Sequence, residues 1–441
     1  MILLLGGISM ENKNMLLDSY YVEGSDINEF YEQVIAMSKR THIHKIFGSD
    51  VSFGSEYTGK FQNYNVNGTS NVKADMSSFI AFYHLTAANL EKIRNNVKNE
   101  NEKPMVGVVQ KSILTPELIS ELSSGTGLIM CCERGNFVKN RSLKTLLVSN
   151  NTLKTLSQRV ELGGNNFFTQ KGFFRDLYLA SIIFEKNIEM TIVYREIERA
   201  GKLFATFSNK YHCTIKQDIL VDVMKHPNFA FKDFTMKSYR IDNFITEAIL
   251  VSETDPETGI TPGIIITNSD TGYSSFSIQT AFFAENSYVI HSEFTIKHSK
   301  KLKVDNILST FDNAKKSLEK ASFIKDMAYL KRKKLPLYND TNDDILNIEE
   351  LINKSMNVID FINKQLSEVY SNVMSKVKQN EAATKIASKM AYGKEYNYLD
   401  FAIKLIEAAS FFPELDHSTN VALHRIAYNT PKVLKKIKSD N

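Results

Sequence analysis

Apolar residues recur at three- and four-residue steps between Ile345 and Val373, which is the spacing of one face of an α-helix. No proline interrupts this stretch. The pattern therefore predicts one long amphipathic helix over 342–380. Two shorter helices should follow, separated by Pro413, over 396–410 and 417–429.

The middle of the chain instead contains several short strand-like segments that are separated by turn residues. Segments 189–195 and 203–207 flank a short turn that contains Gly201, which predicts an antiparallel hairpin. Short connections rich in turn residues favour antiparallel pairing of the later segments too. Further strands are expected at 236–241, 248–252, 263–267, 275–282 and 288–296, with a short helix over 216–226.

The first 150 residues mix both patterns. Ser25 and Asp26 can cap a helix that runs to about Arg40, and Thr115 followed by Pro116 is typical of a helix start. The predicted fold class is α+β, with a mixed N-terminal part, an antiparallel strand-rich middle and an all-helical C-terminal third. The predicted domains are 1–150, 151–304 and 305–441.

The composition is that of a globular protein, because 43% of the 441 residues are hydrophobic and 24% are charged. This balance excludes wholesale disorder. Three cysteines argue against a disulfide scaffold and fit a reducing compartment. No stretch reaches the roughly 7–15 apolar residues of a secretion signal or the roughly 18 of a membrane helix. We therefore expect a soluble, cytoplasmic protein with no membrane partner.

Positive charge is concentrated between Thr295 and Lys334. This segment holds twelve Lys or Arg against four acids, a net charge of +8 in a chain whose total is +4. Concentrated positive charge is the footprint expected for binding a polyanion such as nucleic acid, and a solvated lysine-rich helix face is the alternative. The nucleic-acid-binding candidates are Lys297, Lys300, Lys301, Lys303, Lys331, Arg332, Lys333 and Lys334, with Lys210 and Tyr211 from the central region.

Motifs for catalysis or metal binding are weak. Asp270-Thr271-Gly272 has the residue types of an aspartic-protease carboxylate loop, but polar residues precede it, and we interpret it as a turn. We expect Asp270→Asn to change stability by at most about 1 kcal/mol, through lost turn bonding. His42 and His44 can share one face of a strand, without an identifiable third ligand. No catalytic residue, metal site or cofactor is predicted.

Three short segments occur in a characteristic order. Segment 152–159 places small and apolar residues before Leu-Ser-x-Arg, segment 204–211 ends in Ser-Asn-Lys-Tyr, and segment 267–274 contains an Asn-Ser-x-x-Gly turn. Together they resemble the phage- and plasmid-like proteins of domain-of-unknown-function family 932, over about 152–335. The resemblance implies a mobile-element context, a bacterial host cytoplasm and no established activity. The residues of the family-motif turn are Asn268, Ser269 and Gly272.

These turn residues also have a purely structural interpretation, in which the Asn and Ser side chains bond backbone amides and Gly272 adopts a positive φ. Two functional hypotheses stay open. The first is a non-enzymatic protein of a bacteriophage or mobile element that handles single-stranded DNA in replication or recombination. The alternative is a phage structural, assembly or host-interaction protein, for which self-association into a homo-oligomer is also open.

Overall fold

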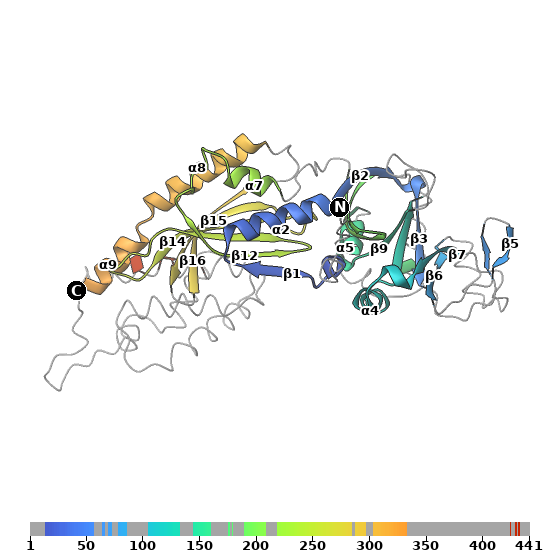
Figure 1. Cartoon of the computed structure of the whole chain (residues 1–441). Helices are drawn as coiled ribbons and strands as arrows, with labels where there is room; N and C mark the ends of the chain where they lie inside the picture. The colour runs from blue at the N-terminus through green and yellow to red at the C-terminus, as the bar shows by residue number, and fades with distance from the viewer. Residues whose placement is uncertain are drawn as a thin grey trace, which may run out of the picture.

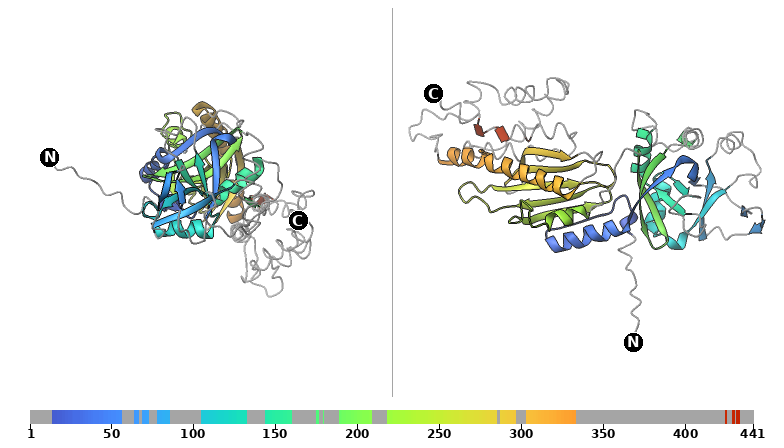
Figure 2. Two further views of the ribbon diagram at one scale, coloured as in Figure 1. Left: turned by 90° about the vertical axis from the view of Figure 1, so that its right-hand side faces the viewer. Right: turned by 90° about the horizontal axis from the view of Figure 1, so that it is seen from above.

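The computed structural model describes residues 14–56, 64–66, 69–72, 78–85, 105–132, 144–159, 175–176, 179, 189–208, 218–284, 287–296, 303–332, 424, 428–429 and 431–432. The described chain forms two β-sheets that lie side by side, each with helices packed on it (Figure 1). The same two lobes are seen from above in Figure 2. A separate two-stranded sheet pairs β4 (Tyr64–Val66) with β5 (Thr69–Val72).

The first large sheet has six strands, all antiparallel, in the order β1-β12-β13-β14-β15-β16. Five of these strands are consecutive in the chain, as the turn-rich sequence predicts. The sixth, β1, joins the edge from far upstream, where Tyr21 pairs with Asp242. The strands are β1 (Tyr21–Gly24), β12 (Thr235–Asp242), β13 (Thr246–Val251), β14 (Thr261–Asn268), β15 (Phe276–Ala284) and β16 (Ser287–Ile296).

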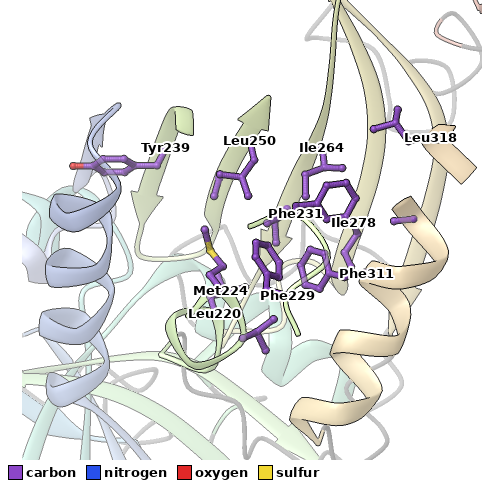
Figure 3. Packing of buried hydrophobic residues seen from close by; sticks show 14 of the residues in the cluster. Leu220, Met224, Phe229, Phe231, Tyr239, Leu250, Ile264, Ile278, Phe311 and Leu318 are labelled. Atoms are coloured by element: carbon purple, nitrogen blue, oxygen red, sulfur yellow. The ribbon is translucent and has the colours of Figure 1, made fainter. Parts of the chain in front are cut away.

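One face of this sheet is covered by three helices, α2 (Ile27–Arg40), α7 (Ile219–Met224) and α8 (Val304–Lys320). Their apolar stripes and the inward-facing strand residues form the main hydrophobic core. Figure 3 shows Phe229, Phe231 and Phe311 packed beneath the strands, and the rings of Phe229 and Phe311 meet edge to face at 5.0 Å. The predicted cap of α2 is confirmed, since the Asp26 carboxylate accepts from two backbone amides of the first turn.

The second large sheet has eight strands in the order β2-β10-β11-β9-β8-β3-β6-β7. All of its neighbours are antiparallel except β11 and β9, which run parallel. The strands are β2 (Thr41–Phe47), β3 (Val51–Glu56), β6 (Phe79–His84), β7 (Met105–Gln110), β8 (Leu128–Cys132), β9 (Lys144–Val148), β10 (Glu189–Ile197) and β11 (Ala200–Ser208).

Short helices complete this second lobe. Helix α4 begins as predicted, with Pro116 in its first turn and the Thr115 hydroxyl accepting from the Leu118 amide at 3.3 Å. The short helices of this lobe are α4 (Pro116–Ser124), α5 (Asn150–Arg159) and the 3₁₀ turns η1 (Asn14–Leu16), η2 (Gly48–Asp50) and η5 (Lys111–Ile113).

The predicted fold class is wrong in its arrangement. The described chain is dominated by two mostly antiparallel sheets with few helices, instead of a mixed N-terminal part, a strand-rich middle and a helical C-terminal third. The predicted hairpin at 189–207 does form, but it pairs with strands from the N-terminal part. The predicted domains stay predictions, and strand pairing crosses residue 150 in both large sheets.

The segment after β16 forms two helices, α8 and α9 (Phe323–Arg332), because the backbone of Ala321 is extended. The buried stripe of α8 ends at Leu318, and the next buried apolar residue is Phe323. In a continuous helix, a residue five positions after Leu318 would point away from the buried stripe. The break at Ala321 lets Phe323 face the core as well. The helices predicted over 342–380 and 396–410 lie outside the described residues, as does most of the helix predicted over 417–429.

Further along, His424 and Tyr428 pack against the β16 edge of the six-stranded sheet. The His424 and Tyr288 rings stack at 5.1 Å, and the Tyr428 and His291 rings stack at 4.4 Å. None of the helices that the structure describes is long and apolar enough to cross a membrane.

Candidate functional site

The family-motif turn lies at the junction of the two large sheets. Ser269 and Gly272 behave as the turn interpretation predicts, because the Ser269 hydroxyl accepts from the Tyr273 amide at 3.0 Å and Gly272 has a φ of +68°. Asn268 does not. Its side chain is fully buried, and neither of its amide atoms has a hydrogen-bond partner in the part of the chain that the structure describes.

Asp270, in the same turn, binds across the junction to Arg195 of β10. The Arg195 Nη2 donates to Oδ1 at 2.9 Å and to Oδ2 at 3.1 Å, and both side chains are buried. Nη1 donates to the backbone and side-chain oxygens of Asn243, and the guanidinium lies 4.7 Å from the Phe204 ring centroid. This buried and paired carboxylate holds the two sheets together and is inaccessible to a substrate.

Beside this junction opens a cavity of about 460 Å³. We call it the waist cleft. It is bounded by the segment that leads into β1, by the β12–β13 hairpin and by the loop after β14. Its described lining residues are Asp18, Ser19, Tyr20, Tyr21, Arg240, Asp242, Phe244, Ile245, Glu247 and Tyr273.

Two tyrosines of the waist cleft are unusually exposed for large aromatic residues. Tyr21 is 55% exposed and Tyr273 is 56% exposed. Each already has a cation near its ring: the Arg240 guanidinium lies 5.5 Å from the Tyr21 centroid, and the Lys154 ammonium lies 5.4 Å from the Tyr273 centroid. The cleft therefore presents aromatic surface whose electron-rich faces attract positive charge.

The carboxylates of the waist cleft differ in how they are neutralised. Asp18 forms an ion pair with the buried Lys202 at 2.9 Å, and Lys202 also contacts Glu121. Asp242 accepts from two backbone amides of its own hairpin and lies 3.5 Å from Arg240. These two acids are thus compensated within the fold.

Glu247 is the exception. Its side chain makes no hydrogen bond or ion pair with any residue that the structure describes, although its cross-strand neighbour is Arg240. Burial raises the pKa of the Glu247 carboxyl above its usual 4.5, the nearby Arg240 charge lowers it and Asp242 raises it further. Glu247 also lines a second hollow of about 560 Å³ on the same sheet, which shares Ile245 and Tyr273 with the waist cleft.

Lys303, the predicted basic candidate whose side chain the structure describes, does not line the waist cleft. Lys303 is exposed at the start of α8, and Lys331 and Arg332 belong to α9, with side chains that are not described. The remaining candidates lie outside the described residues, namely Lys210, Tyr211, Lys297, Lys300, Lys301, Lys333 and Lys334.

The exposed side of α8 carries both signs of charge. From its cap at Lys303 to its last residue, the helix has four lysines and three acids that are at least partly exposed, a net charge of +1. These residues are Lys303, Lys315, Lys316 and Lys320 on one hand, and Asp305, Asp312 and Glu319 on the other. For α8 itself, the polyanion-binding and the solvated-face interpretations both stay predictions.

His42 and His44 do share one face of β2, as the alternation predicts, and both rings stack on Tyr194 at 5.0 and 5.8 Å. Among the described residues, no group of three or more His, Cys, Asp or Glu side chains is placed to hold a metal ion.

Sequence reasoning missed the waist cleft, because its residues come from three separate stretches, and only Tyr273 falls within a motif segment, 267–274. Its only sequence signals were isolated tyrosines beside turns. No family model, curated protein or solved structure matches the chain.

Proposed function

We propose that this chain is a non-enzymatic interaction protein whose waist cleft binds a segment of a protein partner. The observation that carries the proposal is the pair of tyrosines, Tyr21 and Tyr273, each more than half exposed on the walls of one cleft. Tyrosine is enriched at protein interfaces, where it supplies contact area at a low cost in conformational entropy. A volume of about 460 Å³ fits one or a few side chains of a partner.

The ion pairs of the buried acids support a binding role for the chain over a catalytic one. Asp270 is paired with Arg195, and Asp18 with Lys202. A carboxylate that acts as a general base must reach the proton it abstracts, and these groups are held by cations of the fold. The buried charges therefore serve the scaffold that presents the cleft.

This proposal falls within the alternative hypothesis of a structural, assembly or host-interaction protein. The hypothesis of single-stranded DNA binding stays a prediction. Most of its candidate residues lie outside the described part of the chain. The bacteriophage context, the bacterial cytoplasm and a homo-oligomer likewise stay predictions.

The test is selection of random dodecapeptides displayed on phage against the purified full-length protein. Peptides recovered with the wild type should bind about tenfold more weakly to Tyr21→Ser and Tyr273→Ser, because tyrosine is enriched among the few residues that carry most of the binding energy of an interface. Phe47→Ser is the matched control, since Phe47 is 48% exposed on β2 and lies outside the cleft. Failure to recover peptides, or equal loss in all three variants, would contradict the proposal.

A further inference from the structure

The charges of the waist cleft identify the chemistry of its partner, an inference that rests on the proposed function. Four described residues of the lining are charged: Asp18, Arg240, Asp242 and Glu247. Asp18 is neutralised by Lys202, while Arg240 and Asp242 face one another at 3.5 Å. Glu247 is the one carboxylate of the described lining that forms no hydrogen bond or ion pair with a described residue, because its cross-strand neighbour Arg240 lies closer to Asp242.

We propose that the partner segment inserts a lysine or arginine side chain into the waist cleft and donates a hydrogen bond to the Glu247 carboxylate. Such a bond is charge-assisted on both sides and is stronger than a neutral one. It also supplies the counterion that a partly buried carboxylate needs.

The tyrosines suit the same side chain. The long aliphatic stem of lysine or arginine packs along aromatic surface while its charged head reaches further in. The rings of Tyr21 and Tyr273 already have cations of the fold about 5.5 and 5.4 Å from their centroids. A partner cation over the other face of either ring would meet the same ring electrostatics, against the repulsion of the cation already there.

An anionic partner suits this cleft poorly. Arg240 is the one described cation of the lining, and it already lies beside Asp242. A phosphate placed there would meet Glu247 and Asp242 at close range, and like charges repel in a partly desolvated site. Charge complementarity therefore favours a basic protein segment over a nucleic acid.

The experiment uses four pools of immobilised dodecapeptides that carry lysine, arginine, norleucine or glutamate at one central position and mixed residues elsewhere. Norleucine keeps an unbranched aliphatic stem without the charge. The full-length wild type should bind the lysine and arginine pools about tenfold more tightly than the norleucine pool. Glu247→Gln should bring this ratio close to one.

Glu253→Gln is the matched control, since Glu253 is exposed just beyond the end of β13 and should leave the ratio unchanged. Equal binding to all pools, tightest binding to the glutamate pool, or a preference for lysine that survives in Glu247→Gln would overturn the inference. Displacement of the lysine pool by oligothymidylate with Kd below that of the peptides would also overturn it, in favour of a nucleic acid.

Failure of this inference can be told apart from failure of the proposed function. Peptides that need Tyr21 and Tyr273 but show no preference for a cation would leave the proposed function standing and remove the basic partner. Absence of binding to every pool would count against both.

Discussion

The Arg195–Asp270 ion pair is the residue-scale contact on which the junction depends. Both side chains are buried, and the guanidinium is further bonded to Asn243 and to the Thr41 hydroxyl. Removing one partner of a buried pair leaves an uncompensated charge, which costs about 3–5 kcal/mol. This burial overturns the expectation that Asp270 matters only for turn bonding.

Asp270→Asn should therefore lower the free energy of unfolding by about 3–5 kcal/mol, measured by urea denaturation. Asp233→Asn makes the same chemical change at an exposed position and should stay within about 0.5 kcal/mol of the wild type. Equal effects of the two substitutions would show that the ion pair contributes little.

A second residue-scale prediction compares two glycines with the same backbone conformation. Gly272 has a φ of +68° and Gly259 a φ of +72°, a region that costs an L-residue about 1–2 kcal/mol. A Cβ on Gly259 would meet nothing within 4 Å, whereas a Cβ on Gly272 would come within 2.3 Å of the Phe207 ring. Phe207 is itself buried, so it has little room to move.

Gly272→Ala should destabilise the protein by about 1–3 kcal/mol more than Gly259→Ala, because only the former adds overpacking to the backbone cost. Thermal unfolding of both variants measures this difference. Identical melting temperatures would mean that Phe207 moves aside without cost.

At the element scale, the contact of His424 with β16 depends on pH. The His424 Nδ1 accepts from the Ile290 amide at 3.4 Å, and burial lowers the pKa of His424 to about 4. The neutral ring is therefore the form that docks. Since the unfolded pKa is near 6.5, stability from this contact is present above about pH 6.5 and is lost as the pH falls towards 4.

We expect docking at His424 to weaken by about 2 kcal/mol between pH 7 and pH 5. The measurement is hydrogen exchange of the Ile290 amide in the wild type and in His424→Phe, which keeps a ring but does not titrate. Comparison at the same pH removes the intrinsic pH dependence of exchange. A difference in protection that is the same at both pH values would contradict the prediction.

At the scale of the whole molecule, Asn243 connects the two lobes. Its side-chain amide donates to the backbone carbonyls of Met15 and Leu17, and its oxygen accepts from Arg195. These partners belong to the eight-stranded lobe and to the segment leading out of it, while Asn243 lies in the β12–β13 hairpin. Loss of this side chain should weaken the coupling between the lobes.

Asn243→Ala should therefore broaden or split the unfolding endotherm in differential scanning calorimetry, with the first transition several degrees below that of the wild type. Asn228→Ala, at an exposed position in the six-stranded lobe, is the matched control and should leave one transition. An unchanged single transition in Asn243→Ala would show that the lobes are coupled elsewhere.

The sequence by itself determined the local elements. Asp26 and the Thr115-Pro116 pair marked helix starts, short apolar runs between turn residues marked the strands between 189 and 296, and Gly272 marked a positive φ. Each of these features depends on residues within a few positions of one another, where capping, side-chain period and backbone sterics act directly.

Only the tertiary structure decided which strands pair and which side chains meet. β1 joins β12, β10 joins β2, and Arg195 meets Asp270 across 75 residues of chain. The waist cleft likewise combines Tyr21, Glu247 and Tyr273. A local sequence period does not specify which distant residues meet. These contacts form because burial and charge pairing in the whole fold outweigh the entropy lost on closing long loops.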